Sequence, residues 1–134
     1  MLALQDRAEM KVKLVRTESP GCEAILNIEG CDYCVRDGFS WSAERTDGDF
    51  EVSLSTVLDD SWSWEDMFAA NPDQRIGLEP VEGYSYLAFG RILSIDPVRI
   101  DCGLLVEERA LYTHDPRVVG DFVGFKILVL DAEG

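Results

Sequence analysis

Hydrophobic and polar positions alternate along most of this chain, which is the pattern of β-strands with one buried face. The clearest example is residues 50–57, where Phe50, Val52 and Leu54 are expected to face inward and the residues between them outward. The same alternation, or a short apolar run, predicts further strands at 11–17, 22–28, 39–43, 84–95, 98–102, 104–107 and 122–130. The chain is therefore expected to be rich in β-sheet.

Turn residues separate these predicted strands. Asp47-Gly48 lies between 39–43 and 50–57, and this dipeptide favours the positive φ angles of a tight hairpin. Gly90 interrupts the long apolar run of 84–95, which predicts a bulge or a sharp coil there. These breaks favour antiparallel neighbours over long crossovers.

Helical spacing is evident in one segment. Ser63 and Asp66 have the spacing of a capping box, in which each side chain accepts a backbone hydrogen bond of the other residue. Trp64 and Phe68 follow at positions i and i+4, and Pro72 stops the helix. A short helix is predicted after Ser63.

The predicted elements define an all-β, mainly antiparallel fold with one short helix. A long coiled strand, a short hairpin and a closing strand are typical of a small OB-like or SH3-like barrel, and a β-sandwich is the other candidate. The 134 residues fit a single β-rich domain over 10–134, with residues 1–9 as a loose N-terminal extension. Because such barrels have unrelated functions, the architecture does not identify one.

Charge changes the picture more than composition does. The chain has 26 acidic residues against 12 Lys and Arg, a net charge of -14. This excess argues against nucleic-acid binding, which uses basic side chains, and against docking on anionic membranes. No leader pattern and no apolar run of membrane-spanning length occurs, so a cytoplasmic location is expected.

The acidic residues concentrate in 43–73, where Arg45 is the only cation. Trp62 is expected to be exposed there, while Trp41 and Trp64 are expected in the core. An acidic surface with an exposed aromatic suits a basic protein, so a non-enzymatic immunity-type or antitoxin-type inhibitor is the leading hypothesis. The alternative is that the excess of acidic residues only keeps the protein soluble and binds no partner. The predicted partner-binding residues are Glu44, Asp47, Asp49, Glu51, Asp59, Asp60, Trp62, Glu65 and Asp66.

The four cysteines are Cys22, Cys31, Cys34 and Cys102. Cys31 and Cys34 have the C-x-x-C spacing of zinc and redox sites, but a zinc ribbon repeats the close pair and a redox pair begins a helix. The flanks here indicate a β-hairpin. Free cysteines are therefore expected, with zinc or a disulfide as alternatives, and no metal or cofactor is predicted.

The alternative function is a small-molecule or hydrolytic pocket near His114. This is the only histidine, so any imidazole base must be His114, with Cys102 as a nucleophile and Asp115 to orient the ring. The competing interpretation is a structural turn in which Asp115 accepts backbone hydrogen bonds and Arg117 pairs with a carboxylate. No catalytic residue is assigned on this basis.

Overall fold

The computed structural model describes residues 10–40 and 49–134, with the side chain of Asp49 left undescribed. The described residues form two compact units. The first unit contains residues 10–40, 49–57, 81–85 and 128–134, and the second contains 58–80 and 86–127. The prediction of a single domain over 10–134 stays a prediction, and the predicted extension 1–9 lies outside the described residues.

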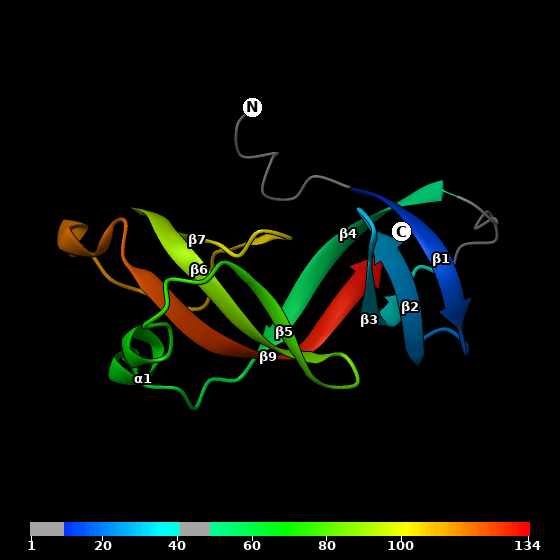
Figure 1. The fold of residues 1–134 in the computed structure, drawn as a ribbon, viewed down its shortest axis with the longest axis horizontal. Helices are drawn as coiled ribbons and strands as arrows, with labels where there is room; N and C mark the ends of the chain where they lie inside the picture. The colour runs from blue at the N-terminus through cyan, green and yellow to red at the C-terminus, as the bar shows by residue number, and fades with distance from the viewer. Residues whose placement is uncertain (1–9, 41–48) are drawn as a thin grey trace. The chain divides into compact units, whose positions relative to one another are not determined.

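The first unit is built on β1 (Met10–Thr17), β2 (Glu23–Ile28) and β3 (Cys31–Gly38), which follow one another as antiparallel hairpins. β1 also pairs with β4 (Asp49–Leu58), and the end of β3 pairs in parallel with the end of β9 (Phe122–Glu133). Figure 1 shows β1, β2 and β3 side by side. Glu29-Gly30 makes the tight turn between β2 and β3, with both residues at positive φ.

The interior of the first unit is formed by alternate side chains of these strands. Val12 and Leu26, in predicted strands, are buried within it, and so is Val35 on β3, a strand that was not among those predicted. Val52 on β4 is also fully buried, with Glu51 and Ser55 exposed on either side. Two polar residues of this unit are also buried, Asp37 on β3 and Thr56 on β4.

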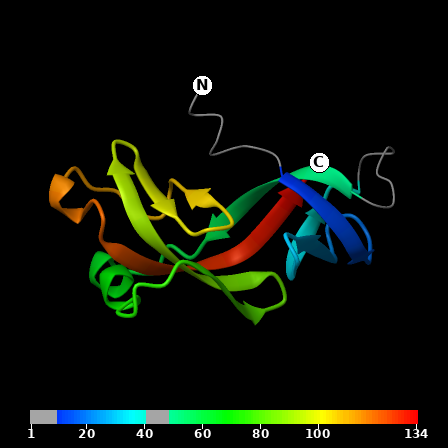
Figure 2. The ribbon, with the colours of Figure 1, turned by 45° about the horizontal axis from the view of Figure 1, so that its top comes forward.

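The second unit is an antiparallel sheet with a helix beside it. β6 (Ser85–Ile95) pairs on one side with the first half of β9 and on the other with β7 (Val98–Asp101), which pairs with β8 (Val106–Glu107) (Figure 2). β5 (Gly77–Glu82) pairs with β6. The remaining elements are α1 (Trp64–Ala69) and the 3-10 turn η2 (Pro116–Val118). The prediction of a mainly antiparallel β-protein with one short helix is thus confirmed for the described residues.

The capping box that the sequence predicts is present at the start of α1. Ser63 Oγ accepts a hydrogen bond from the Asp66 N–H at 3.1 Å, and Asp66 Oδ2 accepts one from the Ser63 N–H at 3.0 Å. Both bonds satisfy donors that a helix start leaves unpaired. Met67 faces the interior, and the helix ends at Ala69 before Pro72.

Replacing Ser63 by Ala should therefore weaken the second unit. The substitution removes the acceptor for the Asp66 N–H, and we expect a loss of about 1 kcal/mol in the free energy of unfolding. Urea titration followed by circular dichroism measures the loss. Ser63→Asp keeps a capping oxygen and is the matched control; equal losses in both variants would show that the cap does not stabilise α1.

Two sequence predictions need correction. Trp64 was expected in the core, but it is 46% exposed and its ring lies edge-on against Phe68 at the surface of α1. Gly90 was expected to form a bulge, but the β6–β9 register runs through it without a shift, and the irregularity in β6 lies between Ile92 and Ser94. Trp41, the strand residues 41–43 and the Asp47-Gly48 turn lie outside the described residues.

Candidate functional site

The segment that joins β4 to α1, together with α1, carries most of the described residues of the predicted partner-binding face. Asp59 begins it, and its Oδ1 accepts hydrogen bonds from the Ser61 N–H at 2.9 Å and the Ser61 hydroxyl at 2.6 Å. The Ser61 hydroxyl, followed by its backbone N–H and by the charge of Lys126, lowers the pKa of Asp59 below its usual value. The turn at Asp59 therefore presents an ionised carboxylate at neutral pH.

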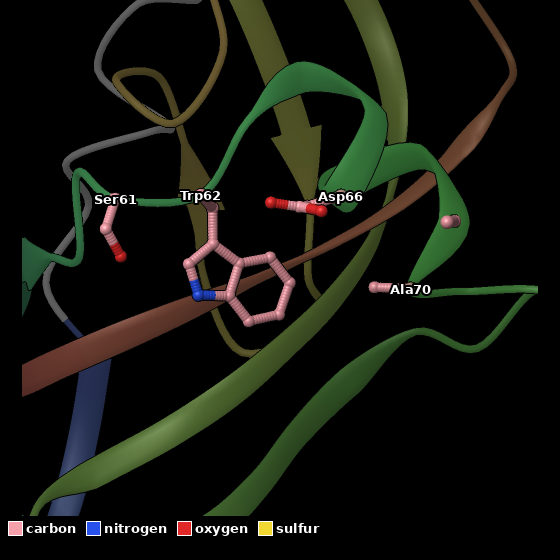
Figure 3. Close-up of a pocket in the computed structure, with 5 residues that line it drawn as sticks. Ser61, Trp62, Asp66 and Ala70 are labelled. Carbon is pink, nitrogen blue, oxygen red and sulfur yellow. The ribbon is translucent and has the colours of Figure 1, made fainter.

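Trp62 follows this turn and lines two hollows of the second unit. The first is an open depression of about 460 Å³. It is bounded by Ser61, Trp62, Asp66, Ala69 and Ala70. Figure 3 shows the Trp62 ring, the Asp66 carboxylate and the Ala70 methyl group around one open space. An aromatic face and a carboxylate thus border the same hollow, and no cationic side chain lines it.

The second hollow is smaller and more enclosed, with a volume of about 120 Å³. Two carboxylates, Asp59 and Asp60, and two cations, Arg109 and Lys126, line it together with Trp62. Apolar side chains complete the lining: Leu58, Met67, Ala110 and Phe125. The two hollows therefore share one indole but differ in charge.

Asn71 fixes the end of α1 against β9 and so holds the wall of the first hollow in place. Its side chain is buried, donates to the carbonyl oxygens of Arg75 at 2.9 Å and Val123 at 3.1 Å, and accepts from the Arg75 N–H at 2.8 Å. These bonds tie the Asn71 side chain to the backbone of Arg75 and of Val123 on β9. Gly124 on β9 allows the close approach, because a Cβ there would lie 2.9 Å from the Ala70 Cβ.

Acidic residues dominate this region of the chain. From Asp59 to Asp73 the sequence holds five acidic residues and no Lys or Arg. The hydrogen bond from the Ser63 backbone, then that of its side chain, lowers the pKa of Asp66. Asp60 and Glu65 are exposed and form no salt bridge within 10–40 or 49–134.

The structure brings together only part of the predicted face. Asp59, Asp60, Trp62 and Asp66 border the two hollows, and Glu65 is exposed on α1 beside them in the sequence. Glu51 is exposed on β4 in the first unit. Glu44 and Asp47, and the side chain of Asp49, lie outside the described residues. The expected exposure of Trp62 also needs qualification, since its ring is half-buried and less exposed than Trp64.

Sequence reasoning missed Arg109 and Lys126 as neighbours of the acidic segment. Lys126 lies beside the acidic segment because the end of β4 meets β9 there: the Asp59 N–H donates to the Lys126 carbonyl oxygen at 3.0 Å. The two residues are separated by most of the second unit in the sequence. No local pattern indicates a contact of that range.

The loop around His114 has the structure of a capped turn. Asp115 Oδ1 accepts from the Arg117 N–H at 2.9 Å, and the Arg117 guanidinium binds the same carboxylate at 2.8 Å. Hydrogen bonds from Arg117 lower the pKa of Asp115 to about 2. His114 is exposed, and its Nε2 lies 3.3 Å from the hydroxyl of Tyr112, whose ring packs edge-on against the imidazole. The structure thus shows the backbone hydrogen bond to Asp115 and the carboxylate pairing of Arg117 that the turn interpretation predicted, while a functional role of the loop stays a prediction.

The cysteines show no activated thiol. Cys102 is fully buried, and burial, with the charges of Glu107 and Asp101, raises the pKa of its thiol. A buried, protonated thiol is a poor nucleophile. Cys22, Cys31, Cys34 and Cys102 are unbridged, and no group of three or more His, Cys, Asp or Glu side chains in 10–40 and 49–134 has the geometry to hold a metal ion.

No family model, curated protein or solved structure matches this chain. Among the residues that the structure describes, no helix has the length and apolar character needed to cross a membrane. The geometry and charge of the two hollows are therefore the features of this chain that bear on its function.

Proposed function

We propose that this protein is a non-enzymatic binding module of the immunity or antitoxin type that holds a basic protein at the segment from Asp59 to Asp73. The observation that carries the proposal is the first hollow, where the Trp62 ring and the Asp66 carboxylate border one open space without a cation. A Lys or Arg side chain of the partner would stack on the indole and pair with the carboxylate. Arg is favoured, because its planar guanidinium suits both contacts.

The charge of the surrounding segment supports the same partner. Its carboxylates would raise the rate at which a basic surface meets the hollow and would orient it. The nearest arginine in the sequence, Arg75, is engaged elsewhere: it pairs with Glu79 at 3.1 Å and its guanidinium lies 4.2 Å from the centre of the Phe89 ring. It therefore does not neutralise the segment.

We infer for the first unit an OB-type barrel. β1 pairs with β2 and β4, β2 pairs with β3, and β4 neighbours β9, while the parallel pairing of β3 with β9 would close the ring. In OB folds the loop between the fourth and fifth strands contributes to the binding surface. In this chain the segment from Asp59 begins the connection from β4 to β9. That position in the chain is consistent with a binding role for the segment.

A short cationic peptide tests the proposal directly. We expect N-acetyl-Gly-Arg-Gly-amide to bind the first hollow and N-acetyl-Gly-Glu-Gly-amide not to bind, with NMR shifts of the Asp66 and Ala70 backbone amides, which line the hollow, as the readout. Trp62→Ala should weaken binding about tenfold, the value of one desolvated cation–π contact and its packing. Trp64→Ala, which removes a more exposed indole outside the hollow, should change affinity less than twofold, which is below about 0.5 kcal/mol.

Salt provides the second arm of this test. Raising the salt concentration from about 50 to about 500 mM should weaken the arginine peptide severalfold, since screening shortens the reach of the carboxylates. Binding that is unaffected by salt and by Trp62→Ala would overturn the proposed function.

A further inference from the structure

We infer that the second hollow holds a carboxamide, an Asn or Gln side chain of the same partner segment that places its cation in the first hollow. This inference rests on the proposed function, because it concerns the same partner, but a different set of side chains carries it. The second hollow is lined by two carboxylates and two cations, whereas Asp66 is the only charged residue that lines the first. The two hollows therefore select for different groups.

The charges of the second hollow favour a neutral dipole over an ion. A partner carboxylate would gain from Lys126 and Arg109 but would be repelled by Asp59 and Asp60. A partner cation would be attracted by Asp59 and Asp60 but repelled by Lys126 and Arg109. A carboxamide presents an acceptor oxygen and an NH₂ donor on one carbon, so its two ends can face the cations and the carboxylates together.

The volume and the lining agree with a group of this size. The hollow measures about 120 Å³, room for a carboxamide and the last methylene of its side chain but not for a drug-sized ligand. Leu58, Met67 and Phe125 supply an apolar lining for that methylene. Some of the charged side chains already have partners within the protein: Asp59 Oδ1 accepts a hydrogen bond from Ser61, and the Arg109 guanidinium lies 3.5 Å from the Glu107 carboxylate. These bonds hold the lining in position before a ligand arrives.

The shared indole fixes the spacing of the two partner groups. Trp62 lines both hollows, so the cation and the carboxamide must reach two sides of one residue. In an extended segment, residues i and i+2 point to the same face and are roughly 7 Å apart. We therefore expect the partner to carry an Arg-x-Gln or Arg-x-Asn sequence in extended conformation.

Three peptides that differ at one position test this inference: N-acetyl-Arg-Gly-Gln, N-acetyl-Arg-Gly-Leu and N-acetyl-Arg-Gly-Glu, each ending in an N-methylamide so that only the glutamine peptide carries a primary carboxamide. The glutamine peptide should bind about threefold to tenfold more tightly than either of the others, the gain of one or two hydrogen bonds. Lys126→Met keeps the apolar stem of the side chain and removes its donor. It should abolish the preference for glutamine over leucine.

The outcomes separate the two proposals. If no arginine peptide binds, the proposed function fails and this inference fails with it. Two other results are equal affinity of all three peptides and tightest binding by the leucine or glutamate peptide. Either result would support a cation site in the first hollow and would overturn the assignment of a carboxamide to the second. A glutamine preference that survives Lys126→Met would also overturn it.

Discussion

Asp37→Ala should lower the free energy of unfolding by about 3 to 5 kcal/mol, the largest loss we expect from any single substitution in this chain. Asp37 is fully buried on β3, yet its carboxylate is hydrogen-bonded on all sides. Oδ1 accepts from the N–H groups of Phe39 at 3.0 Å and Ser40 at 2.8 Å. Oδ2 accepts from the hydroxyls of Ser40 at 2.6 Å and of Thr17. Alanine would leave these donors without their acceptor inside the first unit.

The same carboxylate makes stability depend on pH. Burial acts to raise the pKa of Asp37, but the hydrogen bonds from Ser40, Thr17 and the Phe39 backbone outweigh it, so the pKa lies below the ordinary value of 3.8. A group with a lowered folded-state pKa stabilises the protein fully above its unfolded-state pKa. The stabilisation should therefore be present above about pH 4 and disappear as the pH falls through the lowered folded-state value.

Two variants separate the charge of Asp37 from its position. Asp37→Asn keeps one acceptor oxygen, so we expect a smaller loss of about 1 to 2 kcal/mol and a flatter stability profile between pH 4 and pH 2 than wild type shows. Asp32→Ala removes an exposed carboxylate of the same strand, which binds Asn27 at 2.8 Å, and should change stability by less than about 1 kcal/mol. Urea titrations at a series of pH values measure all three. An Asp37→Ala variant as stable as Asp32→Ala would show that the hydrogen bonds of Asp37 do not stabilise the fold.

Local patterns predicted those parts of the fold that depend on neighbouring residues in the sequence. Alternation in β4 identified Val52 as buried, and the Ser63–Asp66 spacing identified the capping box. Both features arise within one strand or one helical turn. The hairpin of β2 and β3 was likewise predictable, because Glu29-Gly30 can adopt the positive φ angles of its turn.

The features that local patterns missed depend on residues far apart in the chain. The parallel pairing of β3 with β9 joins residues that are 95 apart at Arg36 and Asp131, and a bidentate ion pair of these two side chains accompanies it. The burial of Asp37 follows from the same arrangement, since an isolated Asp on a strand gives no sign that Thr17 will meet it. The second hollow combines α1 with β9 and the segment after β8 in the same way, whereas the first is formed by residues 61–70 alone.

Trp64 illustrates a different reason for error. Spacing of i and i+4 with Phe68 predicts that two aromatic residues contact each other, and they do, with ring centres 5.4 Å apart. It does not predict which face of a short helix is buried. In α1 the interior position is taken by Met67, one residue before Phe68, so the indole remains largely in solvent. The pairing was predictable and its burial was not.

Gly90→Ala should destabilise the second unit by about 2 to 3 kcal/mol, because there is no room for a Cβ at this position. A Cβ on Gly90 would lie 2.6 Å from the Asp101 carbonyl oxygen, 2.6 Å from the Ile100 Cγ2 and 3.0 Å from the Cys102 Sγ. The carbonyl oxygen belongs to β7, whose register with β6 places Arg91 opposite Asp101. It cannot move aside without disturbing that pairing. Close packing of β6 on β7, and not a bulge, is therefore the reason for glycine here.

Gly124→Ala on β9 is the matched control for Gly90→Ala. Its Cβ would meet the Ala70 Cβ at 2.9 Å and the Phe89 ring at 3.4 Å. The Ala70 Cβ moves only with its backbone, but Ala70 caps a six-residue helix and lies outside the strand pairing, so it can shift more easily than the Asp101 carbonyl group. We expect a loss of about 1 kcal/mol for this variant, at the low end of overpacking. Urea titration compares the two variants, and hydrogen exchange of the β6 and β7 amides shows where each loss falls. Faster exchange along β7 in Gly90→Ala alone would confirm that the strain lies between these two strands, whereas equal stability of the variants would contradict the close approach at Asp101.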